Sequence, residues 1–320
     1  MRATPRRILV TGATAPVGRA VCGALLARPE VELVFAVGRE PPERAGLGSH
    51  GGRLCYRQAD LAGWRRMHDL LFGPARRAGI EVLAHLAWHR SSHTGRRVHA
   101  LHVEALRSAL EALDRHPSLR RVVLRSHADV YRVAPHLATI VDESHPLRIG
   151  DPAPQWLLDR VEADLEAAVR VGASGGEICV LRCAEVLAAG TGSQLYDYLS
   201  APVCFTPLGF DPMLNLLSLE DVADAIARAC TAASARGIYN VPGADTLPVS
   251  ECIRLAGRIE LPLPGPCLDG LYELRRAVRG ADFSYRHNER RLHFPAVLDG
   301  GRIAREFGYR PRVPLRWPPR

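Results

Sequence analysis

The N-terminal half of the chain alternates short apolar runs with segments of helical periodicity. The apolar runs occupy residues 7–10, 31–37, 53–58, 81–87, 121–125 and 177–182. Apolar positions at three- and four-residue spacing predict helices that begin at Pro16 and that cover residues 65–71, 94–115 and 156–169. Because continuous apolar strands alternate with helices, we predict an α/β fold whose parallel sheet is covered by helices on both faces.

The pattern becomes irregular after Val186 and richer in proline and glycine. Helical periodicity returns over 218–233, where Ser218 and Asp221 form a variant of a capping box, and residues 237–241 resemble one more buried strand. We therefore predict a first domain over 1–186, to which 214–241 returns. Residues 187–213 and 242–320 are predicted to form a smaller lobe.

The amino-acid composition excludes every catalytic mechanism that requires a lysine side chain. All 42 basic residues are arginine, because the chain contains no lysine. A lysine Schiff base, a phosphate-loop lysine and a Tyr-x-x-x-Lys proton relay are thus excluded. The formal net charge is +8, but the arginines are scattered along the chain, so we expect a solvated surface and no nucleic-acid partner.

The cysteines and the hydropathy define the expected compartment. The eight cysteines form no C-x-x-C pair and no zinc-spaced cluster with histidine, so we expect small core residues, a reducing environment and no metal. No apolar run reaches the roughly 18 residues that a membrane helix needs, and the first residues lack a signal-peptide pattern. We expect a cytoplasmic protein without a membrane partner, either a monomer or a homodimer.

A glycine-containing loop follows the first predicted strand and opens the first helix at residues 11–18 (TGATAPVG). Its glycines allow a tight turn and close helix packing, and the helix N-terminus offers amides and a positive dipole to a pyrophosphate. Pro16 lacks one amide donor, so the Val17 amide carries more of the contact. The alternative is an ordinary β-to-α turn. The predicted cofactor contacts here are Gly12, Thr14, Ala15, Pro16, Val17 and Gly18.

Two further positions concern the adenosine end of a dinucleotide. Arg39 follows the second predicted strand, where an acidic residue would bind the ribose hydroxyls of NAD. An arginine suits the extra phosphate of NADP, so we expect NADPH, with NADH as the alternative; a plain surface arginine is the other interpretation. Asp60 and Leu61 follow the third strand, where a carboxylate can accept a hydrogen bond from the adenine amino group.

These segments resemble the extended short-chain dehydrogenase/reductases, the NAD(P)-dependent epimerase/dehydratase family. Besides the loop and Asp60-Leu61, the resemblance includes residues 85–87 (HLA), 126–131 (SHADVY), 181–186 (LRCAEV) and 218–223 (SLEDVA). It implies a Rossmann doubly wound sheet with a C-terminal substrate-binding lobe, and a nicotinamide cofactor that also contacts Leu86, Ala87, Arg160 and Cys183.

The catalytic residues of that family are missing. The resemblance implies a Ser/Thr, a Tyr and a Lys, of which the tyrosine exchanges the proton while the serine orients the carbonyl. Aligned on the same segments, this chain has His127, Trp156 and Arg160 at these positions. His127 is the best candidate for a proton donor, although a role in the pocket wall is the alternative; Arg160 cannot act as a base.

Two hypotheses follow. The first is a ketoreductase in which a phenol next to the ketone supplies the proton, as implied by a resemblance to the atypical angucyclinone ketoreductases of antibiotic biosynthesis. An aromatic polyketide would then contact Trp88, His127, Tyr131, Trp156 and Phe205. The second is a non-catalytic NAD(P)-binding sensor or regulator. Nucleotide-sugar epimerisation or dehydration ranks third, because it requires the missing tyrosine.

Overall fold

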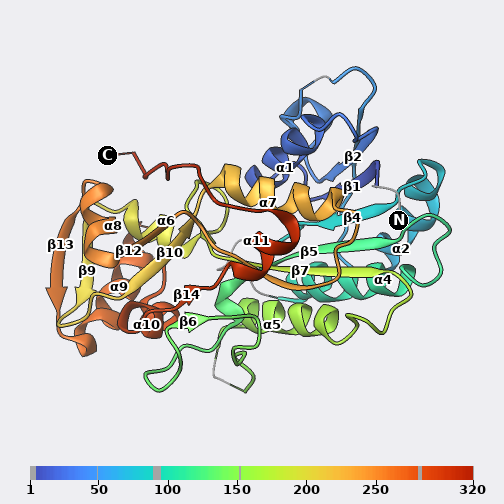
Figure 1. Cartoon of the computed structure of the whole chain (residues 1–320). Coiled ribbons are helices and arrows are strands. Elements are labelled where there is room, and N and C mark those ends of the chain that lie inside the picture. The colour runs from blue at the N-terminus through green and yellow to red at the C-terminus, as the bar shows by residue number, and fades with distance from the viewer. Residues whose placement is uncertain (1–4, 49, 89–94, 151–152, 280–282, 320) are drawn as a thin grey trace.

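A seven-stranded parallel sheet forms the centre of the molecule. The computed structural model describes residues 5–48, 50–88, 95–150, 153–279 and 283–319 (Figure 1). The sheet consists of β1 (Arg7–Thr11), β2 (Leu33–Gly38), β3 (Leu54–Gln58), β4 (Val82–His85), β5 (Arg121–His127), β7 (Glu177–Cys183) and β11 (Gly237–Val241). The strand order is β11-β7-β5-β4-β1-β2-β3, and every neighbouring pair is parallel. The order reverses beside β1, as in a Rossmann fold, so the predicted fold class is confirmed.

Helices cover both faces of this sheet (Figure 1). One face carries α1 (Pro16–Leu26), α7 (Leu219–Thr231) and α11 (Gly301–Phe307), and the other carries α2 (Trp64–Leu70), α3 (Arg96–His99), α4 (Ala105–Ala112) and α5 (Gln155–Ala168). The apolar side chains between them form two cores, one on each side of the sheet. The Ser218 side chain accepts a hydrogen bond from the Asp221 amide at the start of α7, as its capping pattern predicts.

The smaller lobe has a core of its own. Its strands are β8 (Glu185–Val186), β9 (Val203–Pro207), β10 (Met213–Leu217), β12 (Asp245–Pro248) and β13 (Ile259–Leu263); its helices are α6 (Gln194–Leu199), α8 (Val249–Leu255), α9 (Gly265–Arg279) and α10 (Tyr285–His293). The core is rich in aromatic rings, among them Tyr198, Tyr272 and Phe283. The two-residue strands β6 (Ile140–Val141) and β14 (Val297–Leu298) pair with each other.

Two predicted helices differ in detail. Residue 94 lies outside the described residues, and the rest of the helix predicted over 94–115 is divided by a π-helical turn, Ala100–Glu104, and ends at Ala112. A second π-helical turn, Leu71–Ala75, follows α2 and contains Pro74. Proline cannot donate the helical hydrogen bond, which is a recognised cause of such a distortion.

The C-terminal boundary also differs from the prediction. Residues of α11 and the following Tyr309 pack in the core of the first domain, although 242–320 was expected to belong to the smaller lobe. The amides of Arg312 and Val313 donate to the Asp221 carboxylate on α7. Residues 301–313 therefore cross back over the first domain, and the chain then returns to the smaller lobe, where Leu315 and Trp317 pack against its core (Figure 1). No helix in the described part of the chain is long and apolar enough to span a bilayer.

Candidate functional site

The glycine loop has the geometry of a phosphate-binding turn. Gly12 has a φ of +66°, and a Cβ built there would lie 2.9 Å from both the Ala87 Cα and the Leu86 carbonyl oxygen. Helix α1 begins at Pro16, as predicted, so the first amides that its N-terminus offers are those of Val17 and Gly18. A loop this close to the end of β4, followed by a free helix N-terminus, fits the pyrophosphate of a dinucleotide.

Gly18 is required by the loop itself. A Cβ at this position would lie 2.1 Å from the Gly12 carbonyl oxygen and 2.7 Å from the Ala13 Cα. Real side chains do not approach backbone atoms this closely, so only glycine lets the first turn of α1 lie against the loop. Ala15 is the N-cap residue with an extended backbone, and it is exposed.

At the adenosine end, the structure reveals an acidic residue that the sequence analysis missed. Arg39 is exposed and follows β2, as predicted. Its neighbour Glu40 accepts a hydrogen bond from the Thr14 hydroxyl of the glycine loop, and this bond lowers the pKa of Glu40 below its usual value. A carboxylate and a guanidinium thus flank the same end of the loop. The carboxylate suits ribose hydroxyls, whereas the guanidinium suits a phosphate.

The carboxylate of Asp60 is already occupied. It accepts hydrogen bonds from Arg66 and Arg97, each at 2.6 Å, and from the Ala62 amide at 3.2 Å. Leu61 is buried in the adjacent core. Asp60 therefore joins α2 to α3, and an adenine amino group would have to share it with two arginines.

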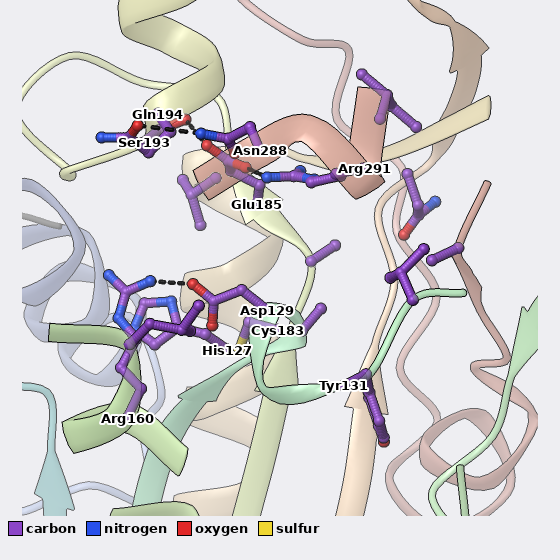
Figure 2. A pocket seen from close by; sticks show the side chains of 18 of the residues that line it. His127, Asp129, Tyr131, Arg160, Cys183, Glu185, Ser193, Gln194, Asn288 and Arg291 are labelled. Carbon is purple, nitrogen blue, oxygen red and sulfur yellow. Dashed lines mark hydrogen bonds and ion pairs between the residues drawn. The ribbon is translucent and has the colours of Figure 1, made fainter. Parts of the chain in front are cut away.

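A cavity opens beyond the carboxyl ends of β5 and β7, between the two lobes. Side chains from β5 and α5 line one part of it, and side chains from β8, the start of α6 and α10 line another (Figure 2). The segment between β8 and α6 connects the cavity to the glycine loop: Gly190 lies against Pro16, while Thr191 and Gly192 line the cavity. The loop and the cavity are thus adjoining parts of one site.

His127 lines the cavity at the end of β5. Its Nε2 atom is buried and has no hydrogen-bond partner. Burial, reinforced by the positive charges of Arg160 and Arg125, holds the pKa of His127 well below 6.5. The imidazole is therefore neutral near pH 7: it can accept or donate a hydrogen bond, but it is not the protonated acid that the sequence analysis considered.

Arg160, which the sequence analysis aligned with the lysine of the family that the chain resembles, is held by Asp129. The two form an ion pair, and the guanidinium also lies 4.8 Å from the ring of Trp156. One carboxylate oxygen of Asp129, Oδ1, and the Nε of Arg160 are buried without partners. Trp156, at the tyrosine position, is buried and lines the cavity. His127, Asp129 and Arg160 thus all line the cavity, and each has a buried polar atom without a hydrogen-bond partner (Figure 2).

Tyr131 lines the cavity, but its hydroxyl is bound elsewhere. It donates to Asn240 Oδ1 at 2.7 Å and accepts from Arg182 at 3.2 Å, and burial raises its pKa to about 12. Cys183 also lines the cavity, and burial raises the pKa of its thiol to about 12. Both groups stay protonated near neutral pH, but Tyr131 already donates its proton to Asn240 and the Cys183 thiol donates to the Leu181 carbonyl oxygen.

The smaller lobe contributes polar residues of which only Glu185 lies in one of the segments that carry the family resemblance, 181–186. Arg291 of α10 pairs with Glu185, and the carbonyl oxygen of the Gln194 side chain accepts from Asn288 at 3.1 Å (Figure 2). They come from segments about 100 residues apart, and only the packing of α10 against β8 and α6 brings them together. Their sequence neighbourhoods carry no signal of this contact.

Two residues predicted to contact substrate do not line the cavity. Phe205 packs against Tyr272 inside the smaller lobe, because β9 directs it into the core of that lobe. Trp88 lies behind His127, with ring centroids 5.4 Å apart, and donates to the Arg125 carbonyl oxygen at 2.8 Å. Its effect on a ligand would therefore pass through His127.

Comparisons with solved structures support the fold. The chain superposes on a dTDP-glucose 4,6-dehydratase from Bacillus anthracis in complex with NAD, with a TM-score of 0.70, 14% identity and coverage of 96% of this chain and 92% of that one. For a UDP-glucuronic acid 4-epimerase mutant from Bacillus cereus, the TM-score is 0.69 and the identity is 16%, with coverage of 96% of this chain and 95% of that one. For the terminal R domain of the myxalamid PKS-NRPS pathway, the TM-score is 0.75 and the identity is 15%, with coverage of 96% of this chain and 86% of that one.

The sequence comparisons identify relatives. No protein-family model matches the chain. It is 30% identical over 318 residues to uncharacterized protein Rv0501 of Mycobacterium tuberculosis, covering 96% of this chain and 81% of that protein. Uncharacterized protein Mb0513 of Mycobacterium bovis gives the same values. The chain therefore belongs to the same family as these mycobacterial proteins and has the Rossmann fold of the extended short-chain dehydrogenase/reductases.

Proposed function

We propose that the protein is a nicotinamide-dependent carbonyl reductase that works without a tyrosine–lysine relay. The observation that carries the proposal is the cavity next to the glycine loop, where buried polar atoms of His127, Asp129 and Arg160 lack protein partners. Buried polar groups are normally hydrogen-bonded, so such a cluster indicates a ligand. A reduced nicotinamide, when bound, supplies hydride.

The residues of the loop fit the cofactor. The amides of Val17 and Gly18 would hold the pyrophosphate, and Gly12 keeps the loop close to Leu86 and Ala87. Arg160, which contacts Asp129 and Trp156, would hold ribose hydroxyls or the carbonyl of a substrate. For the phosphate of the cofactor we propose Arg39 as the partner, hence NADPH.

The proton has to come from outside the protein. Tyr131 is hydrogen-bonded to Asn240, the pKa of His127 is lowered, and the chain has no lysine. General acid catalysis is worth roughly 10²–10⁴-fold in rate, so something must replace it. A phenol beside the ketone holds its proton at a high effective concentration. We therefore propose an aryl ketone with a neighbouring hydroxyl, of the aromatic polyketide class, with the Trp156 and Tyr131 side chains as its walls.

A matched pair of substrates tests this proposal. The first is an aromatic ketone with a free hydroxyl next to the carbonyl, and the second is its methyl ether. We expect NADPH oxidation in single turnover with the first and a rate at least about 10²-fold lower with the second, at equal binding. Equal rates would assign the proton to the protein or to ordered water. No turnover with either, despite cofactor binding, would favour a sensor.

Substitution of His127 gives an independent test. His127→Asn keeps a polar group but cannot act as an imidazole acid. We expect it to retain turnover within about tenfold of wild type. A loss of more than roughly 10³-fold in kcat with intact cofactor binding would make His127 the proton donor and contradict the substrate-assisted proposal.

A nucleotide-sugar epimerase or dehydratase is the second candidate. The observation that favours it is the buried, unpartnered Oδ1 of Asp129, a carboxylate oxygen at the cavity where a base could act. Incubation with a nucleotide sugar and no added reductant distinguishes the two functions. The second candidate predicts an epimer or a dehydrated product, whereas the reductase predicts neither.

A further inference from the structure

A buried arginine, Arg125, lines the cavity beside His127. It lies on β5 and is only 5% exposed. Its Nε has no hydrogen-bond partner, its guanidinium hydrogen-bonds with the Cys183 sulfur, and among the described residues it takes part in no ion pair. Burial lowers its pKa, as expected for a cation removed from water, but a guanidinium stays charged in proteins.

Two other arginines at the cavity are paired with carboxylates, while Arg290 lines it from an exposed position. Arg160 is neutralised by Asp129, and Arg291 by Glu185. His127 is neutral near pH 7. The Asp129 carboxylate also attracts Arg125, but it is already paired with Arg160, so the two buried arginines and this one carboxylate leave one net positive charge at the cavity.

Arg125 is placed to act on the nicotinamide half of the cofactor. In the sheet order, β4 separates β5 from β1, and the glycine loop packs on the end of β4. The segment 190–192 runs from the glycine loop to the cavity. If the loop holds the pyrophosphate, this cavity is the part of the site that receives the nicotinamide.

We propose that the uncompensated charge of Arg125 makes the site bind reduced nicotinamide cofactor in preference to the oxidised form. The inference rests on the proposed function. An oxidised nicotinamide ring carries a positive charge that the reduced ring lacks, and repulsion between like charges is strong where the effective dielectric constant is low. The same charge opposes the positive charge that hydride transfer leaves on the nicotinamide ring, but it stabilises the negative charge that develops on the substrate: hydride passes to the carbonyl carbon, the C=O π pair moves to oxygen, and the oxygen takes the proton of the neighbouring phenol, which is left as a phenolate.

Binding titrations test the inference without a substrate. The dissociation constants of NADPH, NADP⁺, NADH and NAD⁺ are measured by quenching of protein fluorescence. We expect wild type to bind each reduced form at least about tenfold more tightly than its oxidised form, which corresponds to about 1.4 kcal/mol. Arg125→Gln should reduce this ratio at least about fivefold, mainly because the oxidised forms bind more tightly.

Two further variants keep the test decisive. Arg254→Gln removes the same charge from an exposed position on α8, and the ratio should stay at the wild-type value. Arg125→Met replaces the side chain with an unbranched apolar one, in case the glutamine variant does not fold. Equal affinities in wild type, or an unchanged ratio in a folded Arg125 variant, overturn the inference alone. Failure of wild type to bind any of the four dinucleotides overturns the proposed function and this inference together.

Discussion

The guanidinium of Arg160 on α5 forms an ion pair with the carboxylate of Asp129, which follows β5. The Arg160 side chain is 7% exposed and that of Asp129 is 23% exposed. The cation is therefore the more deeply buried partner, and it depends on the carboxylate for neutralisation.

Removing the Asp129 carboxylate alone should lower the free energy of unfolding more than removing Asp129 and Arg160 together. Asp129→Ala leaves Arg160 buried without a counter-ion, and we expect a loss of about 2–4 kcal/mol in the free energy of unfolding, reduced from the fully buried case by the partial exposure of Asp129. In Asp129→Ala/Arg160→Gln the loss should be at least about 1 kcal/mol smaller than the sum of the single variants. Urea unfolding of all four proteins measures this coupling; strict additivity would show that the pair contributes nothing.

Two glycines of α1, Gly18 and Gly23, should respond differently to substitution by alanine, because only Gly18 lies against the glycine loop. Gly18→Ala places a Cβ against the backbone of Gly12 and Ala13, so the loop must move and we expect dinucleotide affinity to fall at least about tenfold. Gly23→Ala, also in α1, meets nothing within 4 Å, and it should keep the affinity and raise stability by about 0.5–1 kcal/mol. Fluorescence titration and thermal unfolding compare the two; equal affinity in both variants would remove the loop from the cofactor site.

The elements that the sequence predicted are those with local signals. The buried strands and the glycine loop are visible as apolar runs and as a turn before a helix. The π-helical turns at 71–75 and 100–104 are not, because helical periodicity alone does not reveal one inserted residue. Each prediction that failed depended on packing rather than on pattern.

The candidate site shows the same division. His127, Arg160 and Trp156 were found because the resemblance assigns positions to them. Arg125 was missed because it is the last residue of the predicted strand 121–125, and the sequence pattern does not distinguish a buried arginine there from one at an exposed strand end. Glu40 lies one residue beyond the expected acidic position, and only the hydrogen bond from Thr14 shows that its carboxylate faces the loop.

Arg39 and Glu40 should have opposite effects on the choice of cofactor. Arg39→Asp removes the proposed partner of the phosphate and adds repulsion, so NADPH affinity should fall at least about tenfold more than NADH affinity. Glu40→Gln removes a carboxylate beside Thr14, and NADPH affinity should rise relative to NADH. Titration of both variants with both cofactors checks the signs. Unchanged NADPH affinity in Arg39→Asp would contradict the assignment of Arg39.

A second buried histidine makes the fold sensitive to acid. His85 ends β4 and is fully buried; its Nδ1 lies 3.1 Å from the Thr11 hydroxyl oxygen, which also accepts from the Leu86 amide. Burial lowers the pKa of His85 from 6.5 to about 4. The Thr11 hydroxyl can donate to Nδ1 only while that nitrogen is unprotonated, so the folded state favours the neutral imidazole.

The sign of the pH dependence follows from this shift. Between pH 6.5 and about 4, the unfolded imidazole binds a proton that the folded one does not. The stability that His85 contributes is therefore complete above pH 6.5 and is lost as the pH falls through this window, by about 2 kcal/mol at pH 5.

We expect His85→Asn, which can accept a hydrogen bond from Thr11 but does not titrate, to lose about 2 kcal/mol less of its free energy of unfolding than wild type between pH 7 and pH 5. Urea unfolding of both proteins at the two pH values measures the difference. His127 and His116, whose pKa values are also lowered by burial, remain in both proteins and cancel. Identical pH dependence in the two proteins would mean that His85 is charged in the folded state.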